Sequence, residues 1–291
     1  MQHSSIRSRC LCHVSALLLT AAWAFLCAPV RADPAGVAVP GFWGAEARVA
    51  KPDLVGARVV RFLTDDEYPP LHFAGAGGEP GGFSVDLARA ACTLLEMSCT
   101  IQVRRFDTLL DSLADRRGDV VAAAIPIRAA LHERFSVTGP YHRTPARFVT
   151  RRAGLRAEEP FSPIFLSGRR VAVVRRTAHE AYLTAFFPQA MRVPFADIAQ
   201  AQLALKEGEV DYLFADGLSL ALWLNGAAAG DCCVFTGGPY LESRFFGEGV
   251  GFILRNDDTA LRDALDYALQ KLWENGTYTE IYLRYFPVSF Y

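Results

Sequence analysis

The sequence predicts a hinged α/β protein of two lobes, each holding a mixed, mostly parallel sheet flanked by helices. A strand–helix–strand pattern runs through residues 58–125 and starts again at residues 170–224. Such alternation is the signature of α/β layers with parallel strand pairing. Two crossing segments, 141–148 and 249–254, and a helical tail at 259–286 complete the pattern. We therefore expect two lobes joined by a two-segment hinge, with a cleft between them.

The first run of elements follows from apolar residues at strand and helix spacing. Ser84 has the side chain of a helix N-cap, and Gly118 is placed to end the next helix. Five glycines and one proline between Gly75 and Gly82 predict a hairpin-like turn. The expected elements are strands at 58–63, 100–103 and 120–125 and helices at 85–95 and 107–117.

The second run repeats this order over about 55 residues, and Gly208 is placed to end its middle helix. The tail is expected to form two helices that separate at Asn275 and Gly276. The expected elements of the second run are strands at 170–174, 191–195 and 212–215 and helices at 179–187, 198–207 and 218–224.

Composition excludes several classes of protein. The chain has 291 residues, which is more than one core of about 100–200 residues needs. Hydrophobic residues make up 51% and charged residues 21%, so the chain is not globally disordered. The 30 basic and 31 acidic residues leave a net charge of −1. Since nucleic-acid binders usually carry a basic excess, we expect no nucleic-acid partner.

Residues 1–32 are typical of a secretory signal peptide. Arg7 and Arg9 precede an apolar run at 14–27, which is too short for the roughly 20 residues that span a bilayer. Val30 and Ala32 suit cleavage after Ala32. An uncleaved anchor is the alternative, and lipidation at Cys27 is disfavoured by the residues before it. Residues 33–56 are expected to form an irregular N-terminal arm.

Four cysteines remain after the leader, and an even number in an exported chain favours disulfides. Cys92 lies late in a helical pattern and Cys99 begins the next strand, so their Cα atoms can approach within the ~4.4–6.8 Å that a disulfide needs. The adjacent Cys232 and Cys233 can pair with each other, stay reduced or bridge elsewhere. No histidine stands at a zinc-site spacing, so we expect neither a metal nor another cofactor.

Four blocks of the sequence resemble the family 3 extracellular solute-binding proteins, which have the type II periplasmic binding protein fold. The last block contains NGTYTEIY, which is similar to the end of many family members. The blocks are YPPLHF with GFSVDLA at 68–73 and 82–88, FDTLLDSL with GD at 106–113 and 118–119, FSVTGPY at 135–141, and LRDALDYALQKLWENGTYTEIY at 261–282. The resemblance covers residues 58–286.

This resemblance implies a domain organisation and a function. Lobe 1 would comprise residues 57–142 and 252–291, and lobe 2 residues 147–248, with hinges near 143–146 and 249–251. A monomeric periplasmic protein would capture a small polar ligand, an amino acid or a related carboxylate, in the cleft. It would then deliver the ligand to a membrane ABC importer.

The resemblance also implies ligand-binding residues. Tyr68 and Phe106 match positions where the family packs aromatic rings on the aliphatic or cationic part of the ligand. Arg128 would clamp a carboxylate with its guanidinium fork. However, it lies seven residues before Phe135, where the family spacing is nearer six, and Pro126 and Ile127 replace family threonines. The alternative for Arg128 is a loop arginine that faces solvent.

Two further candidates lie in lobe 2. Thr177 matches the family's Gly-Thr turn at a helix start, although Arg176 replaces the glycine. Asp216 follows a buried strand and resembles the aspartate that accepts the ligand's ammonium group. Each residue has a simpler interpretation as a helix N-cap, and the two roles are compatible.

Two other functions remain open. One is a dehydratase-type enzyme on the same fold, which would need a positioned acid such as Glu180 or Glu242. The other is a ligand-sensing accessory module that contacts a partner through the N-terminal arm and the Cys232–Cys233 segment. No nucleophile, zinc or phosphate-loop motif supports catalysis, so we expect a binding protein and not an enzyme.

Overall fold

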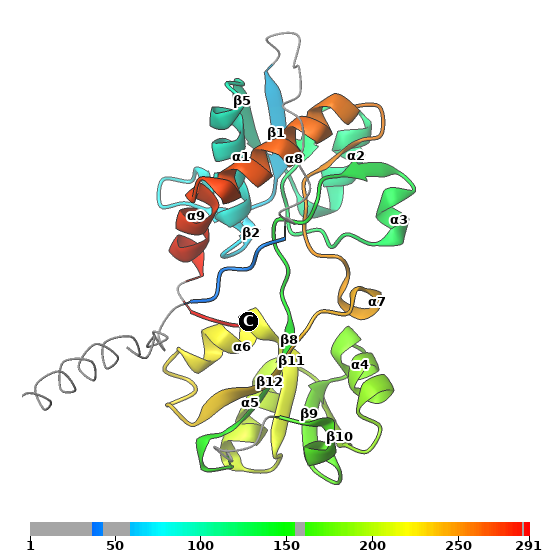
Figure 1. Ribbon diagram of the computed structural model, residues 1–291, viewed down its shortest axis with the longest axis vertical. Helices are drawn as coiled ribbons and strands as arrows, with labels where there is room; N and C mark the ends of the chain where they lie inside the picture. The colour runs from blue at the N-terminus through cyan, green and yellow to red at the C-terminus, as the bar shows by residue number, and fades with distance from the viewer. Residues whose placement is uncertain (1–36, 43–58, 155–160, 287) are drawn as a thin grey trace, which may run out of the picture. The chain divides into compact units, whose positions relative to one another are not determined.

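The computed structural model of the chain describes residues 37–42, 59–154, 161–286 and 288–291. The expected signal peptide and most of the expected arm therefore lie outside the described residues. Two five-stranded sheets and a small three-stranded sheet organise the described chain (Figure 1). Each large sheet defines a lobe, and the helices that pack on it are assigned to that lobe.

Lobe 1 is built on the sheet with strand order β5-β1-β6-β13-β7. Strand β1 pairs in parallel with β5 and β6, whereas β13 runs antiparallel to β6 and β7. The strands are β1 (Val60–Thr64), β5 (Cys99–Val103), β6 (Val120–Val121), β7 (Phe135–Val137) and β13 (Ile253–Arg255), and the helices are α1 (Phe83–Leu94), a 3₁₀ turn (Phe106–Thr108), α2 (Leu109–Ala114), α3 (Ala129–His132), α8 (Thr259–Glu274) and α9 (Thr277–Tyr285).

Lobe 2 is built on the sheet with strand order β10-β9-β11-β8-β12. Strands β10, β9 and β11 are parallel, and β8 is antiparallel to both β11 and β12. The strands are β8 (Ala146–Arg151), β9 (Arg170–Val174), β10 (Met191–Phe195), β11 (Tyr212–Asp216) and β12 (Cys233–Tyr240), the helices are α4 (Ala178–Phe186), α5 (Ile198–Glu207), α6 (Gly217–Leu224) and α7 (Ser243–Phe246), and two 3₁₀ turns span Arg152–Gly154 and Pro163–Leu166.

The small sheet comprises β2 (Glu67–Tyr68), β3 (His72–Ala74) and β4 (Pro80–Gly81). Strands β3 and β4 form an antiparallel hairpin around the glycine-rich turn that the sequence predicts. Strand β2 pairs with β3 so that Tyr68 stands opposite His72. This hairpin connects the end of β1 to the start of α1, and therefore holds the loop that carries Tyr68.

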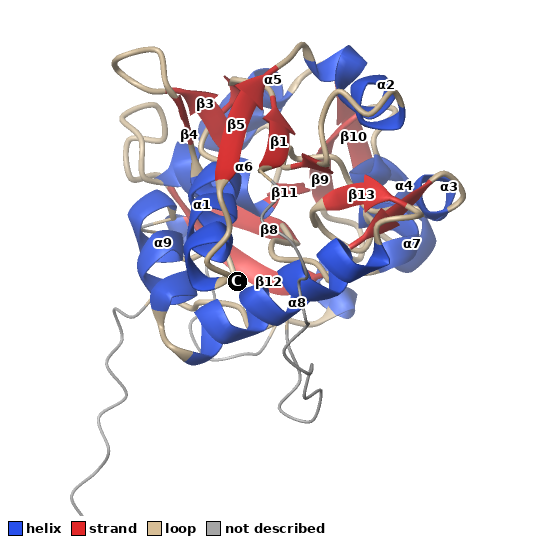
Figure 2. Ribbon diagram, turned by 90° about the horizontal axis from the view of Figure 1, so that it is seen from above, coloured by secondary structure: helices blue, strands red, loops and turns tan. Residues whose placement is uncertain are grey.

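Both large sheets are covered on two faces (Figure 2), as a parallel sheet between helices requires. In β1, Phe62 packs with α1, α8 and α9, while its neighbour Leu63 packs with α2. In β11, Phe214 packs with α4, and Leu213 packs with α5. The alternation along each strand thus divides the apolar residues of each lobe between two layers.

The fold class that the sequence predicts is confirmed, and individual elements differ. Helix α1 begins at Phe83 with Gly82 as its N-cap, so the predicted Ser84 cap is wrong. Gly82 has a φ of 115°, in the region that favours glycine, and a Cβ there would lie 2.5 Å from the Leu71 carbonyl oxygen. The segment Gly237–Tyr240 belongs to β12, where the pairing with β8 shifts register.

Both cysteine pairs form disulfides. Cys92 and Cys99 are linked with a Cα–Cα distance of 6.2 Å, as expected from their positions at a helix end and a strand start. Cys232 and Cys233 are linked to each other, which resolves the three alternatives for this pair. Cys233 is buried and belongs to the apolar layer between the lobe 2 sheet and α5.

No helix within the described ranges is both long enough and apolar enough to cross a membrane.

Candidate ligand-binding site

The candidate residues of lobe 1 follow the carboxyl ends of three neighbouring strands. Tyr68 follows β1, Phe106 follows β5 and Arg128 follows β6. Because β1 pairs in parallel with both β5 and β6, these three segments emerge at one edge of the sheet. Ligands of open α/β sheets bind outside this carboxyl edge. Tyr68 and Phe106 are 55% and 52% exposed, which is high for aromatic rings and leaves both able to contact a ligand.

The candidate residues of lobe 2 occupy the equivalent edge. Thr177 follows β9 and Asp216 ends β11, and these two strands are parallel neighbours. Thr177 caps α4, where its hydroxyl accepts the Glu180 N–H at 3.3 Å and donates to the Val174 carbonyl at 2.7 Å. Arg176 before it has a φ of 60°, in the region that favours the glycine of the family pattern.

Asp216 combines a structural role with a free charge. Its Oδ1 accepts the Ser219 N–H at 2.8 Å, so it caps α6. Burial raises the pKa of Asp216, and the hydrogen bonds from Ser219 and Leu218 only partly offset this effect. Within the described residues, no lysine or arginine forms an ion pair with it. A desolvated carboxylate gains stability from a cationic partner.

The crossing segments join the two carboxyl edges. Strand β7 is parallel to β6 and leaves lobe 1 at the carboxyl edge, and β8 enters lobe 2 at Ala146, directly opposite Asp216. The first and second crossings pair side by side, since the Val250 N–H donates to the His142 carbonyl at 2.8 Å. Burial and, second, the negative charge of Asp216 raise the pKa of Tyr68. The two lobes therefore bring Tyr68 and Asp216 into electrostatic range.

Arg128 stands at the N-terminal end of α3 with extended backbone, beside the return crossing. The Ile127 N–H next to it donates to the Gly249 carbonyl at 2.8 Å. The Arg128 side chain is exposed, and in the described part of the chain it has no hydrogen-bond or ion-pair partner. Its role as a carboxylate clamp stays a prediction.

A buried pair that the sequence did not single out supports the Tyr68 loop. His72 Nε2 accepts the Ala124 N–H at 2.9 Å, so the ring carries its proton on Nδ1, 3.0 Å from Asp65 Oδ1. Burial lowers the pKa of His72, and Asp65 opposes that shift. The ring centroids of His72 and Tyr68 are 5.7 Å apart. This imidazole thus ties the end of β1 to the segment after β6. The position of Asp65 directly after a buried strand was the available signal.

His179 is a second residue that sequence reasoning missed. It lies in the first turn of α4, two residues after Thr177, between the rings of Phe214 and Phe246 at 5.8 and 5.2 Å. Burial lowers the pKa of His179 to about 4. The ring is therefore neutral at pH 7 and adds an uncharged aromatic surface beside the lobe 2 candidates.

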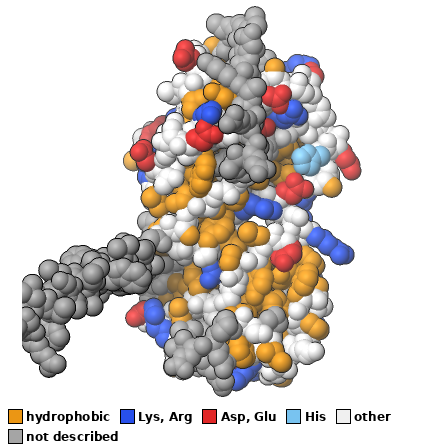
Figure 3. Space-filling view, viewed as in Figure 1, with side chains coloured by type: hydrophobic (Ala, Val, Ile, Leu, Met, Phe, Trp, Pro, Cys, Tyr) orange, Lys and Arg blue, Asp and Glu red, His pale blue; other side chains and the backbone are white. Residues whose placement is uncertain are grey.

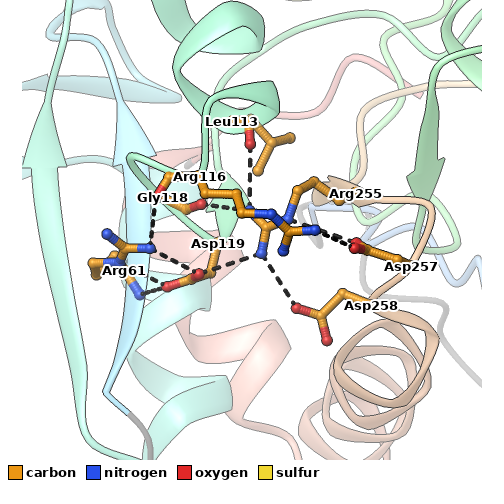
Figure 4. A network of polar contacts seen from close by, with 8 residues as sticks. All are labelled: Arg61, Leu113, Arg116, Gly118, Asp119, Arg255, Asp257 and Asp258. Atoms are coloured by element: carbon orange, nitrogen blue, oxygen red, sulfur yellow. Dashed lines mark hydrogen bonds and ion pairs between the residues drawn. The ribbon is translucent and has the colours of Figure 1, made fainter.

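A cluster of charges lies at the opposite, amino edge of the lobe 1 sheet (Figure 4). Asp119 accepts from Arg61 Nε at 3.0 Å, and Arg255 lies 3.4 Å from it on the other side. Burial opposes the ionisation of Asp119, but the hydrogen bonds and charge of Arg61 outweigh it and hold the pKa below its usual value. Because every member pairs with another and the cluster lies away from the candidate edge, it is a structural network.

An open cavity of about 390 Å³ lies beside α8, lined by Leu94, Tyr267, Lys271, Glu274 and Asn275. Lys271 Nζ and Glu274 Oε2 form an ion pair at 2.5 Å. None of the candidate residues from either sheet edge lines this cavity, so it is not part of the candidate site.

Two α/β lobes that share paired crossings and carry polar and aromatic groups at their carboxyl edges define a solute-binding protein. The family profile of the bacterial extracellular solute-binding proteins, family 3, matches residues 60–288, and the chain belongs to this family. The type II periplasmic binding fold that the resemblance implies is therefore confirmed.

Individual relatives agree with this assignment. The putative ABC transporter arginine-binding protein 2 of Escherichia coli K12 is 31% identical over 234 residues, covering 79% of this chain and 91% of that protein. The L-arginine-binding protein of Pseudomonas aeruginosa is 28% identical over 242 residues, covering 82% and 92%. The second substrate-binding domain of GlnP from Lactococcus lactis, in its open conformation, has a TM-score of 0.67 at 19% identity and covers 82% and 99%.

Proposed function

We propose that this chain binds an amino acid with a cationic side chain between its two carboxyl edges and delivers it to a membrane ABC importer. The observation that carries the proposal is the Asp216 carboxylate, which is desolvated, has no cationic partner in the described chain and acts on Tyr68 of the other lobe. An ammonium group of the ligand would supply the missing charge.

The surroundings of Tyr68 favour a cation as well. Asp66 and Glu67 precede it and are exposed, and the buried Asp65 stands just before them. A cation over the Tyr68 or Phe106 ring would also gain from the electron-rich ring face. The two relatives described above are named as arginine-binding proteins, which agrees with this charge distribution.

The ligand carboxylate would be held by the remaining candidates. Arg128 offers a guanidinium with no partner in the described chain, and Thr177 offers a hydroxyl at the start of α4, where free N–H groups favour an anion. The ligand would thus contact both lobes at once. Its differential contacts would bias the equilibrium between open and closed arrangements.

The same proposal covers compartment and assembly. Export by the signal peptide, with cleavage after Ala32, would place the protein in the periplasm as a monomer. The disulfides at Cys92–Cys99 and Cys232–Cys233 fit an oxidising compartment.

We expect binding without turnover. Both acids considered for catalysis are engaged, since Glu180 Oε2 accepts the Arg176 N–H at 2.7 Å and Glu242 hydrogen-bonds the Tyr182 hydroxyl. The two relatives described above are named as binding proteins. Incubation with cyclohexadienyl or hydroxy acids should leave them unchanged, and turnover of either would support the dehydratase alternative.

The deciding experiment is a thermal-shift and calorimetric screen of the mature protein against L-arginine, L-lysine, L-histidine, L-glutamine and L-glutamate. A ligand at 100 times its Kd stabilises a protein by about 2.7 kcal/mol. We expect that stabilisation for one or more of the cationic amino acids and much less for glutamate. A preference for glutamate would contradict the assignment of the cation, and no response to any amino acid would contradict the proposed ligand class.

A further inference from the structure

The C-terminal tail, residues 288–291, contacts both lobes. Phe290 is 1% exposed, and its ring lies 5.8 Å from Phe286 and 6.3 Å from His142 in lobe 1. Its carbonyl oxygen accepts a hydrogen bond of 3.1 Å from Arg147 Nη1 in strand β8 of lobe 2. Figure 1 shows the C-terminal end beside α6. The tail therefore forms a third connection between the lobes, in addition to the two crossings.

A second bond attaches the tail to the first crossing. The Tyr291 hydroxyl donates to the Arg143 carbonyl oxygen. Arg143 precedes the crossing residues Thr144 and Pro145, and Arg147 follows them. The tail thus binds the first crossing before and after Thr144 and Pro145. A hinge rotation would change the backbone angles of these two residues.

Helix α6 lies against this tail. The Gly217 N–H at its start donates to the Pro145 carbonyl at 2.8 Å, and a Cβ on Gly217 would lie 3.3 Å from the Phe290 carbonyl oxygen. Leu218 and Ala221 belong to the same apolar cluster as Phe290, whereas Leu220 belongs to a lobe 2 cluster. Figure 3 has the same view as Figure 1 and shows hydrophobic side chains gathered in the middle of the molecule, where Figure 1 shows α6. Helix α6 is therefore packed between the two lobes.

The residue that caps α6 is Asp216. We propose that residues 288–291 act as a strap that holds α6, and with it the Asp216 carboxylate, in register with the ligand-binding edge of lobe 1. The inference rests on the proposed function in that Asp216 is taken to contact the ligand. Phe290 and Tyr291 are then positioning residues, since they act through α6 and do not touch the ligand.

The strap would set the fraction of molecules that are ready to bind. When only a fraction f of a protein is competent, its apparent Kd is the intrinsic Kd divided by f. Without the strap, α6 and lobe 2 sample more orientations, so f falls. We expect truncation after Val288 to weaken amino-acid binding by about tenfold and Tyr291→Phe by about threefold, since the latter removes one hydrogen bond.

A matched control is available in the same region. The Tyr285 hydroxyl donates to Asp86 Oδ2 at 2.7 Å, and both residues belong to lobe 1. Tyr285→Phe removes the same atom from a hydrogen bond that does not join the lobes. It should leave affinity within about twofold of the unmodified protein, while its effect on melting temperature should resemble that of Tyr291→Phe.

The experiment combines two measurements. Calorimetry gives the affinity for the amino acid that binds most tightly in the screen. Electron resonance gives the distance between the lobes in the ligand-free protein. Spin labels at Ala114→Cys in lobe 1 and Leu203→Cys in lobe 2, both on exposed helix positions, report the separation of the lobes by electron resonance. The strap predicts that truncation and Tyr291→Phe broaden the distance distribution of the ligand-free protein and weaken binding, and that Tyr285→Phe does neither.

The strap proposal is wrong if the truncated protein and Tyr291→Phe show the same distance distributions and affinities as Tyr285→Phe. It is also wrong if truncation tightens binding. Circular dichroism separates these results from misfolding, and Tyr291→Phe provides the test if the truncated chain does not fold. A failure of the unmodified protein to bind any amino acid would instead contradict the proposed function, while the ligand-free distances would still test the strap.

Discussion

Asp216 of lobe 2 acts electrostatically on the Tyr68 hydroxyl of lobe 1, although 148 positions separate them in sequence numbering (216 − 68). Each residue lies at the carboxyl edge of its own sheet, and the paired crossings connect these edges. A cation bound near Asp216 would meet an aromatic ring whose hydroxyl lies within range of the same carboxylate. The informative substitution at Asp216 therefore removes the charge of the side chain and keeps its shape.

Asp216→Asn separates the proposed ligand-binding role of Asp216 from its role as a helix cap. Asparagine caps helices about as well as aspartate and carries no charge to desolvate, so the free energy of unfolding should not fall. Loss of the charge should weaken ligand binding by about 2–5 kcal/mol, as for truncated buried charge pairs. Calorimetry and urea unfolding on the same sample measure the two effects.

Asp197 provides the matched control for this prediction. It caps α5 by accepting the Gln200 N–H at 2.9 Å, and it follows the edge strand β10. Asp197→Ala should cost about 0.5–2 kcal/mol of stability and leave affinity unchanged. An Asp216→Asn protein that binds the ligand as tightly as the unmodified protein would restrict Asp216 to capping.

The family resemblance indicates the candidate residues, and the apolar runs before them predict the strands that they follow. Asp216 follows the apolar run 212–215, and a strand end positions its next residue at the sheet edge whatever the distant chain does. The Asp65–His72 pair was not accessible in the same way. Its contact depends on β3 folding back on β2 and on the Ala124 N–H from the segment after β6.

The contacts of the strap could not be predicted from the sequence. Phe290 and Arg147 are 143 residues apart, and their bond joins a backbone carbonyl to a side chain with no motif to mark it. Strand β6 shows the opposite error. The apolar run 120–125 predicts a long strand, yet pairing ends at Val121, since the chain then turns toward the crossing and Pro126 pairs with Val250. Tertiary context overrides local pattern at such points.

Acid should destabilise the protein through buried His142. Burial lowers the pKa of His142 to about 3, against about 6.5 in an unfolded chain. The unfolded chain therefore takes up a proton as pH falls below 6.5, while the folded protein does not. Stability is fully present above pH 6.5 and is lost as pH falls, by about 2 kcal/mol at pH 5. Urea unfolding at pH 7.5 and 5.0 measures this loss.

His142→Phe keeps the ring that stacks on Phe286 at 5.0 Å and removes the titrating group. The drop in stability between pH 7.5 and pH 5.0 should shrink by about 2 kcal/mol in this variant. His132→Gln, at an exposed histidine, provides the comparison for the loss of one imidazole. Equal pH dependence in His142→Phe and the unmodified protein would show that His142 titrates normally.

The two disulfides should contribute unequally to stability. The Cys92–Cys99 bond closes a loop across a sequence separation of 7, for which chain entropy predicts about 2.5 kcal/mol. The Cys232–Cys233 bond joins neighbours and constrains almost no loop. Urea unfolding of the two double Cys→Ala variants should show the larger loss for Cys92 and Cys99. A larger loss for the Cys232 and Cys233 variant would mean that this disulfide stabilises the protein through the packing around Cys233.

The last prediction concerns Asp266 on α8, whose burial makes ionisation of its carboxyl group unfavourable. It is partly buried, and its Oδ1 accepts the Gly139 N–H at 2.7 Å. Burial raises the pKa of Asp266 to about 6, above about 3.9 in an unfolded chain. The folded protein therefore retains a proton between pH 4 and 6 that the unfolded chain has lost. Stability accordingly falls as pH rises through this window, and the deficit persists at pH 7.

Asp266→Asn should remove that deficit, because the amide oxygen can still accept the Gly139 N–H and carries no charge to desolvate. We expect the ligand-free variant to be more stable by about 3 kcal/mol at pH 7.5, with the difference vanishing below pH 4. Asp263→Asn, three residues earlier and exposed, should show a smaller gain, because it removes only the repulsion between Asp263 and Asp266. Loss of stability at pH 7.5 in Asp266→Asn would mean that attraction to the nearby Arg262 outweighs the cost of burial, which reverses the sign of the argument.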